Sequence, residues 1–285
     1  MNVMARRIIT AIVGIAILIP FIIFSYTWSI LIFTTLVSAI AVWEIVSCVG
    51  HNKKWYVLAP SFLVSIAVQV LTRILSVDAY LTTVLLTYLG YLVLMMTLAV
   101  FSKGRFKLSD ATQIGTMVVY QSFGFAALVL LRDMEDGIFL FLLAFLIPWV
   151  CDAMAYFVGV FFGKHKMIPD VSPKKTVEGA IGGIVGVVVS AAIFGLVMQF
   201  GFGKTPNYIM LVTISLIGGF VSQWGDLIAS LLKREYSIKD YGKLFPGHGG
   251  IMDRFDSMIA VSIFVYIVCR AFVTSPLFIN YVSCV

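Results

Sequence analysis

Two aspartates in the C-terminal part of the chain, Asp253 and Asp256, have the spacing of a cation site. On a helix, side chains three residues apart project from the same face about one turn apart. Two carboxylates in that arrangement offer the oxygen ligands that a hard divalent cation prefers. The pair therefore predicts a divalent-cation site at the start of a helix.

A short glycine-containing segment, His248, Gly249 and Gly250, immediately precedes this pair. It has little side-chain bulk and leads into a helix N-terminus, where free backbone N–H groups favour anions. Two carboxylates at the same place would repel a phosphate, but a bound Mg²⁺ would bridge carboxylate and phosphate oxygens. We therefore expect a phosphate-containing substrate and Mg²⁺ to meet here.

Two further aspartates, Asp152 and Asp226, lie within otherwise apolar runs. A carboxylate at membrane depth costs at least about 2.5–3.5 kcal/mol, so such residues usually face a bundle interior and meet a cation or a proton. For any single one, pairing with Lys or Arg for packing alone is the alternative. Glu44, in the second apolar run, is interpreted more simply, as a partner for a neighbouring helix or as a residue near the membrane interface.

Two basic loops adjoin these aspartates. The first, Lys164–Glu178, contains Pro173, which prevents a helix through its middle. Near the end of this loop, Thr176 is a predicted N-cap of the following helix. The second is Lys233–Lys243. Ordinary cytoplasmic loops would carry the same charges, but each of these flanks an aspartate-containing run on the same side, which favours a role in binding phosphate.

The elements that must position these side chains are membrane helices. Of the 285 residues, 61% are hydrophobic and 12% are charged, against roughly 45–50% and about 25% in a soluble domain. The mean hydropathy of +1.03 is too high for a soluble body with one anchor. The composition predicts an all-α polytopic membrane protein. The four cysteines form no CxxC pair and are interpreted as small hydrophobic residues.

Runs of roughly 20 apolar residues, long enough to cross about 30 Å of hydrocarbon, recur along the chain. We predict about nine transmembrane helices, near Ile8–Tyr26, Ile30–Cys48, Trp55–Leu71, Tyr80–Phe101, Ile114–Leu131, Ile138–Phe162, Gly179–Phe200, Tyr208–Leu232 and Met252–Phe272.

The positive charges sort strongly between the two sides that nine spans create. Sixteen of the 20 Lys and Arg residues fall on one side, and only Arg73, Arg132, Lys204 and Arg270 fall on the other. Since cytoplasmic loops are enriched in Lys and Arg, the N-terminus is predicted to be cytoplasmic. Basic loops at that face meet anionic headgroups and soluble anions such as nucleotides. No nucleic-acid partner is expected, because no basic stretch accompanies a soluble recognition fold.

The stretch from Ser230 to Asp256, SLLKREYSIKDYGKLFPGHGGIMDRFD, closely resembles the C-terminal pattern of the phosphatidate cytidylyltransferases, or CDP-diacylglycerol synthases. An upstream segment from Asp152 to Gly179 is also similar to that family. The matching positions in the first stretch are Ser230, Lys233, Arg234, Lys239, Asp240, Gly242, Pro246, His248, Gly249, Gly250, Asp253, Arg254 and Asp256.

The resemblance implies transfer of the cytidylyl group of CTP to phosphatidate, with Mg²⁺ as cofactor and K⁺ beside it, in a homodimer. It implies a multi-pass protein of the inner (cytoplasmic) membrane with its active site near the cytoplasmic face. By matching position, Asp226, Asp253 and Asp256 are the metal-ligand candidates, and Asp152 is a weaker one. Arg254 and Lys233 join the three aspartates as catalytic candidates. The substrate-binding candidates are Ser172, Lys174, Lys175, Arg234, Lys239, Asp240, Lys243, His248, Gly249 and Gly250.

For this reaction we expect direct displacement at the α-phosphorus of CTP. The phosphatidate oxygen is largely ionised near neutral pH, so no strong base is required, and His248 is given a positional role. The lysines supply charge for the triphosphate, and Arg254 is assigned to a transferring or lipid phosphate.

Residues 1–137 are predicted to form a helical scaffold, which is also a candidate dimerisation region. Residues 138–285 are predicted to form the catalytic region, with cytoplasmic loops 163–178 and 233–251. A membrane transporter of an anionic or nucleotide substrate is the alternative function, although the halves show no inverted similarity. A CDP-alcohol phosphotransferase would need an Asp-Gly-x-x-Ala-Arg run, which is absent. A purely structural subunit would not need the polar run from Lys233 to Asp256.

The predicted orientation can be tested by cysteine labelling in intact cells. A probe should react from the cytoplasm with Ser172→Cys or Lys239→Cys, and from outside with Lys204→Cys. Reactivity of positions 172 and 204 from the same side would contradict the nine-span arrangement.

Overall fold

The computed structural model describes Pro20, Phe24, residues 28–245, Gly247, residues 249–271 and the backbone of residues 278–280. The predicted first span, Ile8–Tyr26, therefore lies outside the described residues except for Pro20 and Phe24. Pro246 and His248 also lie outside them.

The described chain is almost entirely helical, as the composition predicts. Among the described residues, seven helices are long and apolar enough to cross a membrane. These are α2 (Trp28–Cys48), α3 (Trp55–Ile74), α4 (Val77–Phe101), α5 (Leu108–Asp133), α6 (Gly137–Phe162), α7 (Val177–Phe202) and α8 (Tyr208–Glu235).

A further helix, α9 (Met252–Ala271), coincides with the last predicted run. It carries Asp253, Arg254, Asp256 and Arg270, and it is not among the seven helices that meet the length and hydropathy requirements for a span. An all-α polytopic membrane protein is confirmed. The count of nine transmembrane helices and the cytoplasmic location of the N-terminus stay predictions.

The chain divides into two compact units. The first consists of Met1–Leu130 and Leu232–Phe255, and the second of Leu131–Leu231 and Asp256–Val285. The segment Leu232–Phe255, which holds most of the polar C-terminal pattern, thus belongs to the same unit as the N-terminal helices. The predicted functional division at residue 137 stays a prediction.

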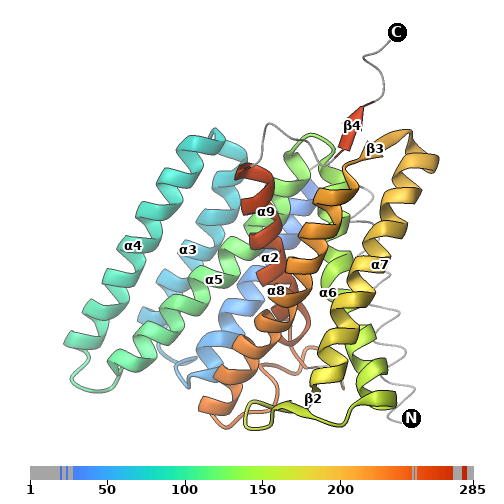
Figure 1. Cartoon of the computed structure of the whole chain (residues 1–285). Coiled ribbons are helices and arrows are strands. Elements are labelled where there is room, and N and C mark those ends of the chain that lie inside the picture. Colours follow the sequence, from blue (N-terminus) through green and yellow to red (C-terminus); the bar gives the residue numbers. More distant parts are fainter. Residues whose placement is uncertain are drawn as a thin grey trace. The chain divides into compact units, whose positions relative to one another are not determined.

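In the first unit, helices α2, α3 and α4 pack in sequence order, and α3 and α4 run side by side (Figure 1). Buried hydroxyl and amide groups join the helices across their apolar contacts. Ser38 Oγ lies 2.6 Å from Ser65 Oγ and donates to Gln121 Oε1 at 3.0 Å. Ser38, Ser65 and Gln121 therefore each have a partner from another helix, which fixes the rotation of α2, α3 and α5 about their axes.

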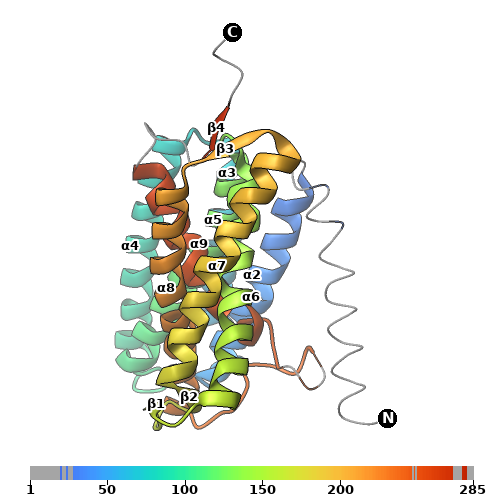
Figure 2. The same ribbon diagram turned by 45° about the vertical axis from the view of Figure 1, so that its right-hand side comes forward.

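In the second unit, α6 and α7 pack closely along their length (Figures 1 and 2). Glycines allow this approach: a Cβ added at Gly183 would lie 2.8 Å from the carbonyl oxygen of Cys151. The two helices are connected through an antiparallel pair, β1 (Lys166–Ile168) and β2 (Ser172–Thr176). The predicted N-cap is confirmed, because the Thr176 side chain accepts a hydrogen bond from the N–H of Gly179.

A second short antiparallel pair in this unit joins β3 (Lys204–Pro206) to β4 (Phe278–Asn280). Nζ of Lys204, the first residue of β3, lies 2.6 Å from Oδ1 of Asp136, which directly precedes α6.

The packing of α6 on α7 predicts different outcomes for two alanine substitutions on one helix. Gly183→Ala should destabilise the protein by about 1–3 kcal/mol, because the new methyl group meets backbone that cannot rotate away. Gly201→Ala, also on α7, meets nothing within 4 Å and should be neutral or slightly stabilising. Thermal unfolding in detergent measures both, and equal melting temperatures would contradict the packing.

Candidate active site

Asp253 is the centre of a polar cluster in the first unit. Its side chain is 4% exposed, and its Oδ1 lies 2.9 Å from Nζ of Lys233, at the end of α8. Its Oδ2 accepts the backbone N–H groups of Tyr241 at 2.8 Å and of Gly250 at 2.9 Å. The Lys233 ammonium also lies 5.5 Å from the ring centroid of Tyr241. A buried carboxylate held by a cation and two donors fixes the loop between α8 and α9 against the end of α8.

The N-terminus of α9 receives a second carboxylate, that of Glu44. Its Oε1 accepts the N–H of Ile251 at 3.0 Å and its Oε2 accepts the N–H of Met252 at 2.8 Å. Glu44 lies on α2 and is buried. A negative charge at this position also interacts favourably with the helix dipole. The backbone donors that the sequence pattern assigns to a phosphate are therefore held by the protein's own carboxylates in this structure.

The glycines of the loop are required by these two carboxylates. A Cβ at Gly249 would lie 2.6 Å from Asp253 Oδ2, and a Cβ at Gly242 or Gly250 would overlap the Glu44 carboxylate. Gly249 also has φ +84°, a left-handed conformation that glycine adopts without strain. Gly242, Gly249 and Gly250 thus allow side chains from α2 and α9 to reach the loop backbone.

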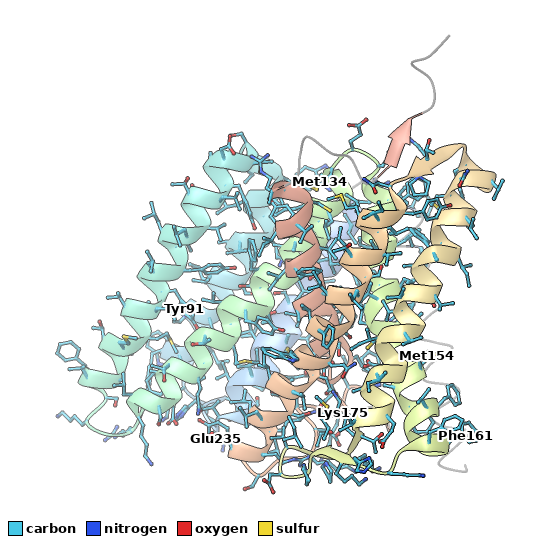
Figure 3. The ribbon with its side chains drawn as sticks, viewed as in Figure 1. Tyr91, Met134, Met154, Phe161, Lys175 and Glu235 are labelled. Atoms are coloured by element: carbon cyan, nitrogen blue, oxygen red, sulfur yellow. The ribbon has the colours of Figure 1, made fainter. Side chains whose placement is uncertain are left out.

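The second unit contains a matching lysine–aspartate pair. Nζ of Lys175 (Figure 3), on β2, lies 2.7 Å from Oδ2 of Asp226 on α8. Ser230 Oγ donates to the other carboxylate oxygen at 3.3 Å. Lys175 also donates to the backbone carbonyl of Gln223 at 3.3 Å. The first basic loop and the aspartate of α8, which the sequence only places on the same side, are therefore in direct contact.

Asp256 lies where α8 and α9 approach each other within the second unit. Gly225, the neighbour of Asp226, allows this approach: its Cβ would lie 2.8 Å from the carbonyl oxygen of Asp256 and 3.1 Å from Cα of Ser257. The Asp256 side chain is buried, and its Oδ1 accepts the N–H of Ser257 at 2.7 Å. The backbone at Asp256 thus adjoins the backbone next to Asp226.

Most of the remaining predicted site residues are exposed rather than buried. Ser172 is half-buried on β2, and Asp152 is exposed on α6. His248 lies outside the described residues. Six more candidates are exposed, namely Lys174, Arg234, Lys239, Asp240, Lys243 and Arg254.

The aspartate oxygens have the chemistry that Mg²⁺ requires. In the part of the chain that the structure describes, no three His, Cys, Asp or Glu side chains are grouped closely enough to hold a metal ion. Asp226 and Asp253 each contact a lysine ammonium instead. The donor chemistry fits a hard cation, and lysines supply the positive charge in this arrangement.

Comparison with known proteins shows to which family this chain belongs. A model of the cytidylyltransferase family matches residues 5–272. The chain belongs to the cytidylyltransferase family. It is 32% identical over 259 residues to the phosphatidate cytidylyltransferase of Staphylococcus haemolyticus (strain JCSC1435), covering 90% of this chain and 96% of that protein.

Two other relatives carry the same name. The protein of Staphylococcus aureus (strain COL) is 33% identical over 261 residues, covering 90% of this chain and 96% of its own length. That of Bacillus subtilis (strain 168) is 40% identical over 180 residues, covering 63% and 65%. Membership of the cytidylyltransferase family makes the protein an enzyme, a nucleotidyltransferase, and does not favour the transporter and structural-subunit alternatives.

Sequence reasoning missed Glu44 as part of this cytidylyltransferase site, although it noted the carboxylate. The signal was that Glu44 is the only acidic residue inside a predicted span before residue 150. Its partners are 207 and 208 residues away along the chain, a separation that no local pattern encodes.

Two adjacent lysines on β2, Lys174 and Lys175, provide a test of the Lys175–Asp226 ion pair. Lys175→Met removes the cation from Asp226 and should destabilise the protein by about 1–3 kcal/mol, because it leaves a partly buried carboxylate without its partner. Lys174→Met, at an exposed position, should change stability by less than about 0.5 kcal/mol. Equal thermal shifts for the two variants in detergent would contradict the Lys175–Asp226 contact.

Proposed function

We propose that this enzyme transfers the cytidylyl group of CTP to phosphatidate, forming CDP-diacylglycerol and pyrophosphate in phospholipid biosynthesis. The observation that carries the proposal is the similarity over 90% of the chain to proteins named phosphatidate cytidylyltransferase. Two lysine–aspartate pairs supply charged groups that such a reaction needs. They are Lys233–Asp253, at the C-terminal end of α8, and Lys175–Asp226, between β2 and α8.

The reaction is a displacement at phosphorus. A phosphate oxygen of phosphatidate forms a new bond to the α-phosphorus of CTP, and the bond from that phosphorus to the β-phosphate oxygen breaks. Pyrophosphate leaves with the electron pair of that bond. The second pKa of a phosphate monoester is about 6, so the attacking oxygen is already ionised at neutral pH and needs no strong base. The enzyme must neutralise two anions and hold them in line.

The basic residues of this chain are suited to that task. Lys175 and Lys233 are each held by an aspartate and are therefore pre-positioned, which lowers the entropy lost when they meet a phosphate. Lys239, Lys243 and Arg254 are exposed and can reach the triphosphate or the lipid headgroup. Arg254 can bind a phosphate through two parallel N–H donors.

By their match to the family pattern, Asp226, Asp253 and Asp256 are each proposed as candidate ligands of Mg²⁺, with Asp152 as an additional candidate and K⁺ as a second cation. When bound, the metal would offset the charge of the triphosphate and stabilise the departing pyrophosphate. The lysines now beside Asp226 and Asp253 would then be available to the phosphates.

We also propose that the enzyme is a homodimer in the inner membrane with its active site near the cytoplasmic face. The charge distribution supports this side, because CTP is a cytoplasmic anion and the basic loops are expected there.

Purified enzyme mixed with CTP, phosphatidate and Mg²⁺ should release pyrophosphate and form CDP-diacylglycerol. Asp256→Asn preserves volume but removes the charge, so activity should fall by about two orders of magnitude or more while the protein stays folded. Asp78→Asn, at the first turn of α4, is the control and should keep full activity. Near-normal turnover by Asp256→Asn would contradict the assigned role of this residue.

Direct displacement also predicts how isotope exchange behaves. Labelled pyrophosphate should enter CTP only when CDP-diacylglycerol is present, because both substrates must be bound together. Exchange without any lipid would indicate a cytidylyl-enzyme intermediate and ping-pong kinetics, and would overturn direct displacement.

A further inference from the structure

The loop between α8 and α9, residues 236–251, is attached at both ends to N-terminal helices of its own unit. At its end, Glu44 on α2 accepts the N–H groups of Ile251 and Met252. At its start, the hydroxyl of Tyr236 donates to Asp110 Oδ1 at 3.3 Å and to Gln113 Oε1, both on α5.

The attachment at Tyr236 is itself supported by a buried contact. Nε2 of His51, which follows α2, lies 2.8 Å from Oδ2 of Asp110. Asp110 therefore joins His51 to Tyr236. Burial, reinforced by the Asp110 carboxylate, raises the pKa of the Tyr236 phenol, so the hydroxyl remains a hydrogen-bond donor at neutral pH.

Glu44 is the more specific of the two attachments. Both of its carboxylate oxygens accept backbone donors at the start of α9, from the two residues that directly precede Asp253. Its carboxylate also lies where a Cβ at Gly242 or Gly250 would be, so it contacts the loop at two places besides the helix N-terminus. A side chain that serves only to join two helices would not require glycine at positions 242 and 250.

We infer that Glu44 is a positioning residue for cytidylyl transfer: it fixes the α8–α9 loop so that the buried Asp253 and its partner Lys233 are held in one arrangement for the reaction. This inference rests on the proposed function. It assigns to α2, a helix of the predicted scaffold, a direct part in shaping the active site, through contacts with the loop backbone rather than with substrate.

The first test uses Glu44→Gln in the full-length purified enzyme. The amide keeps the volume but has one acceptor oxygen, and its NH₂ group would face a backbone N–H. We expect faster hydrogen exchange at residues 241–252, with exchange across α3 unchanged. We expect kcat/KM for CTP to fall about 10- to 100-fold, the cost of misplacing a reacting group by a small distance.

Ser38→Ala is the matched control. Ser38 is also buried on α2, but it hydrogen-bonds to Ser65 and Gln121 rather than to the loop. It should lower stability without changing loop exchange or kcat/KM more than about twofold. Equal kinetic losses in Glu44→Gln and Ser38→Ala would reduce Glu44 to a general packing role and overturn the inference.

A second test of the positioning role leaves the charge of Glu44 unchanged. Gly242→Ala introduces a methyl group against the Glu44 carboxylate, and should reproduce the loop exchange and the kinetic loss. Combined with Glu44→Asp, whose shorter side chain leaves room, it should cost no more than Glu44→Asp alone, because residues in contact are non-additive. Independent, multiplicative losses would contradict the contact.

The outcomes separate this inference from the proposed function. If the wild-type enzyme forms no CDP-diacylglycerol, the proposed function fails, while hydrogen exchange still reports whether Glu44 holds the loop. If the wild type is active and Glu44→Gln loosens the loop without lowering kcat/KM, the positioning role is overturned. Unchanged loop exchange in Glu44→Gln would also overturn it.

Discussion

The organisation of this enzyme depends on how an apolar chain accommodates buried carboxylates. Asp253 is nearly inaccessible, and an isolated charge there would be strongly disfavoured. Its two oxygens are satisfied by Lys233 and by two backbone donors. Because these donors come from the end of α8 and from the loop before α9, satisfying one carboxylate holds Tyr241 and Gly250 of that loop against the end of α8. Glu44 completes the arrangement from α2.

The same constraint explains the composition of the polar segment. The sequence suggests that its glycines leave space for a phosphate. In the structure, Gly249 leaves space for the Asp253 carboxylate, and Gly242 and Gly250 leave space for Glu44. Substrate phosphate would therefore approach a loop that carboxylates have already shaped. The neighbouring lysines provide positive charge in a chain with few charged residues.

Much of the fold was predictable, because membrane helices are encoded locally. The predicted run Ile138–Phe162 corresponds to α6 (Gly137–Phe162), and Thr176 forms the predicted N-cap of α7. The partners of the aspartates were not predictable in the same way. The pairing of Lys175 with Asp226, and of Glu44 with the start of α9, joins segments that are distant in sequence. Such contacts follow from helix packing, which apolar periodicity alone does not specify. The grouping of the α8–α9 loop with the N-terminal helices also depends on contacts of this kind.

A double-mutant cycle on Lys233 and Asp253 tests the central interaction most directly. The free energy of unfolding in detergent is measured for Lys233→Met, Asp253→Asn and the double variant. Each single change leaves one buried charge without its counter-charge, whereas the double change removes both charges. We expect a coupling free energy of about 2–3 kcal/mol, with the double variant far more stable than the sum of the single losses predicts. Additivity within about 0.5 kcal/mol would show that the two side chains act independently, and would contradict this account.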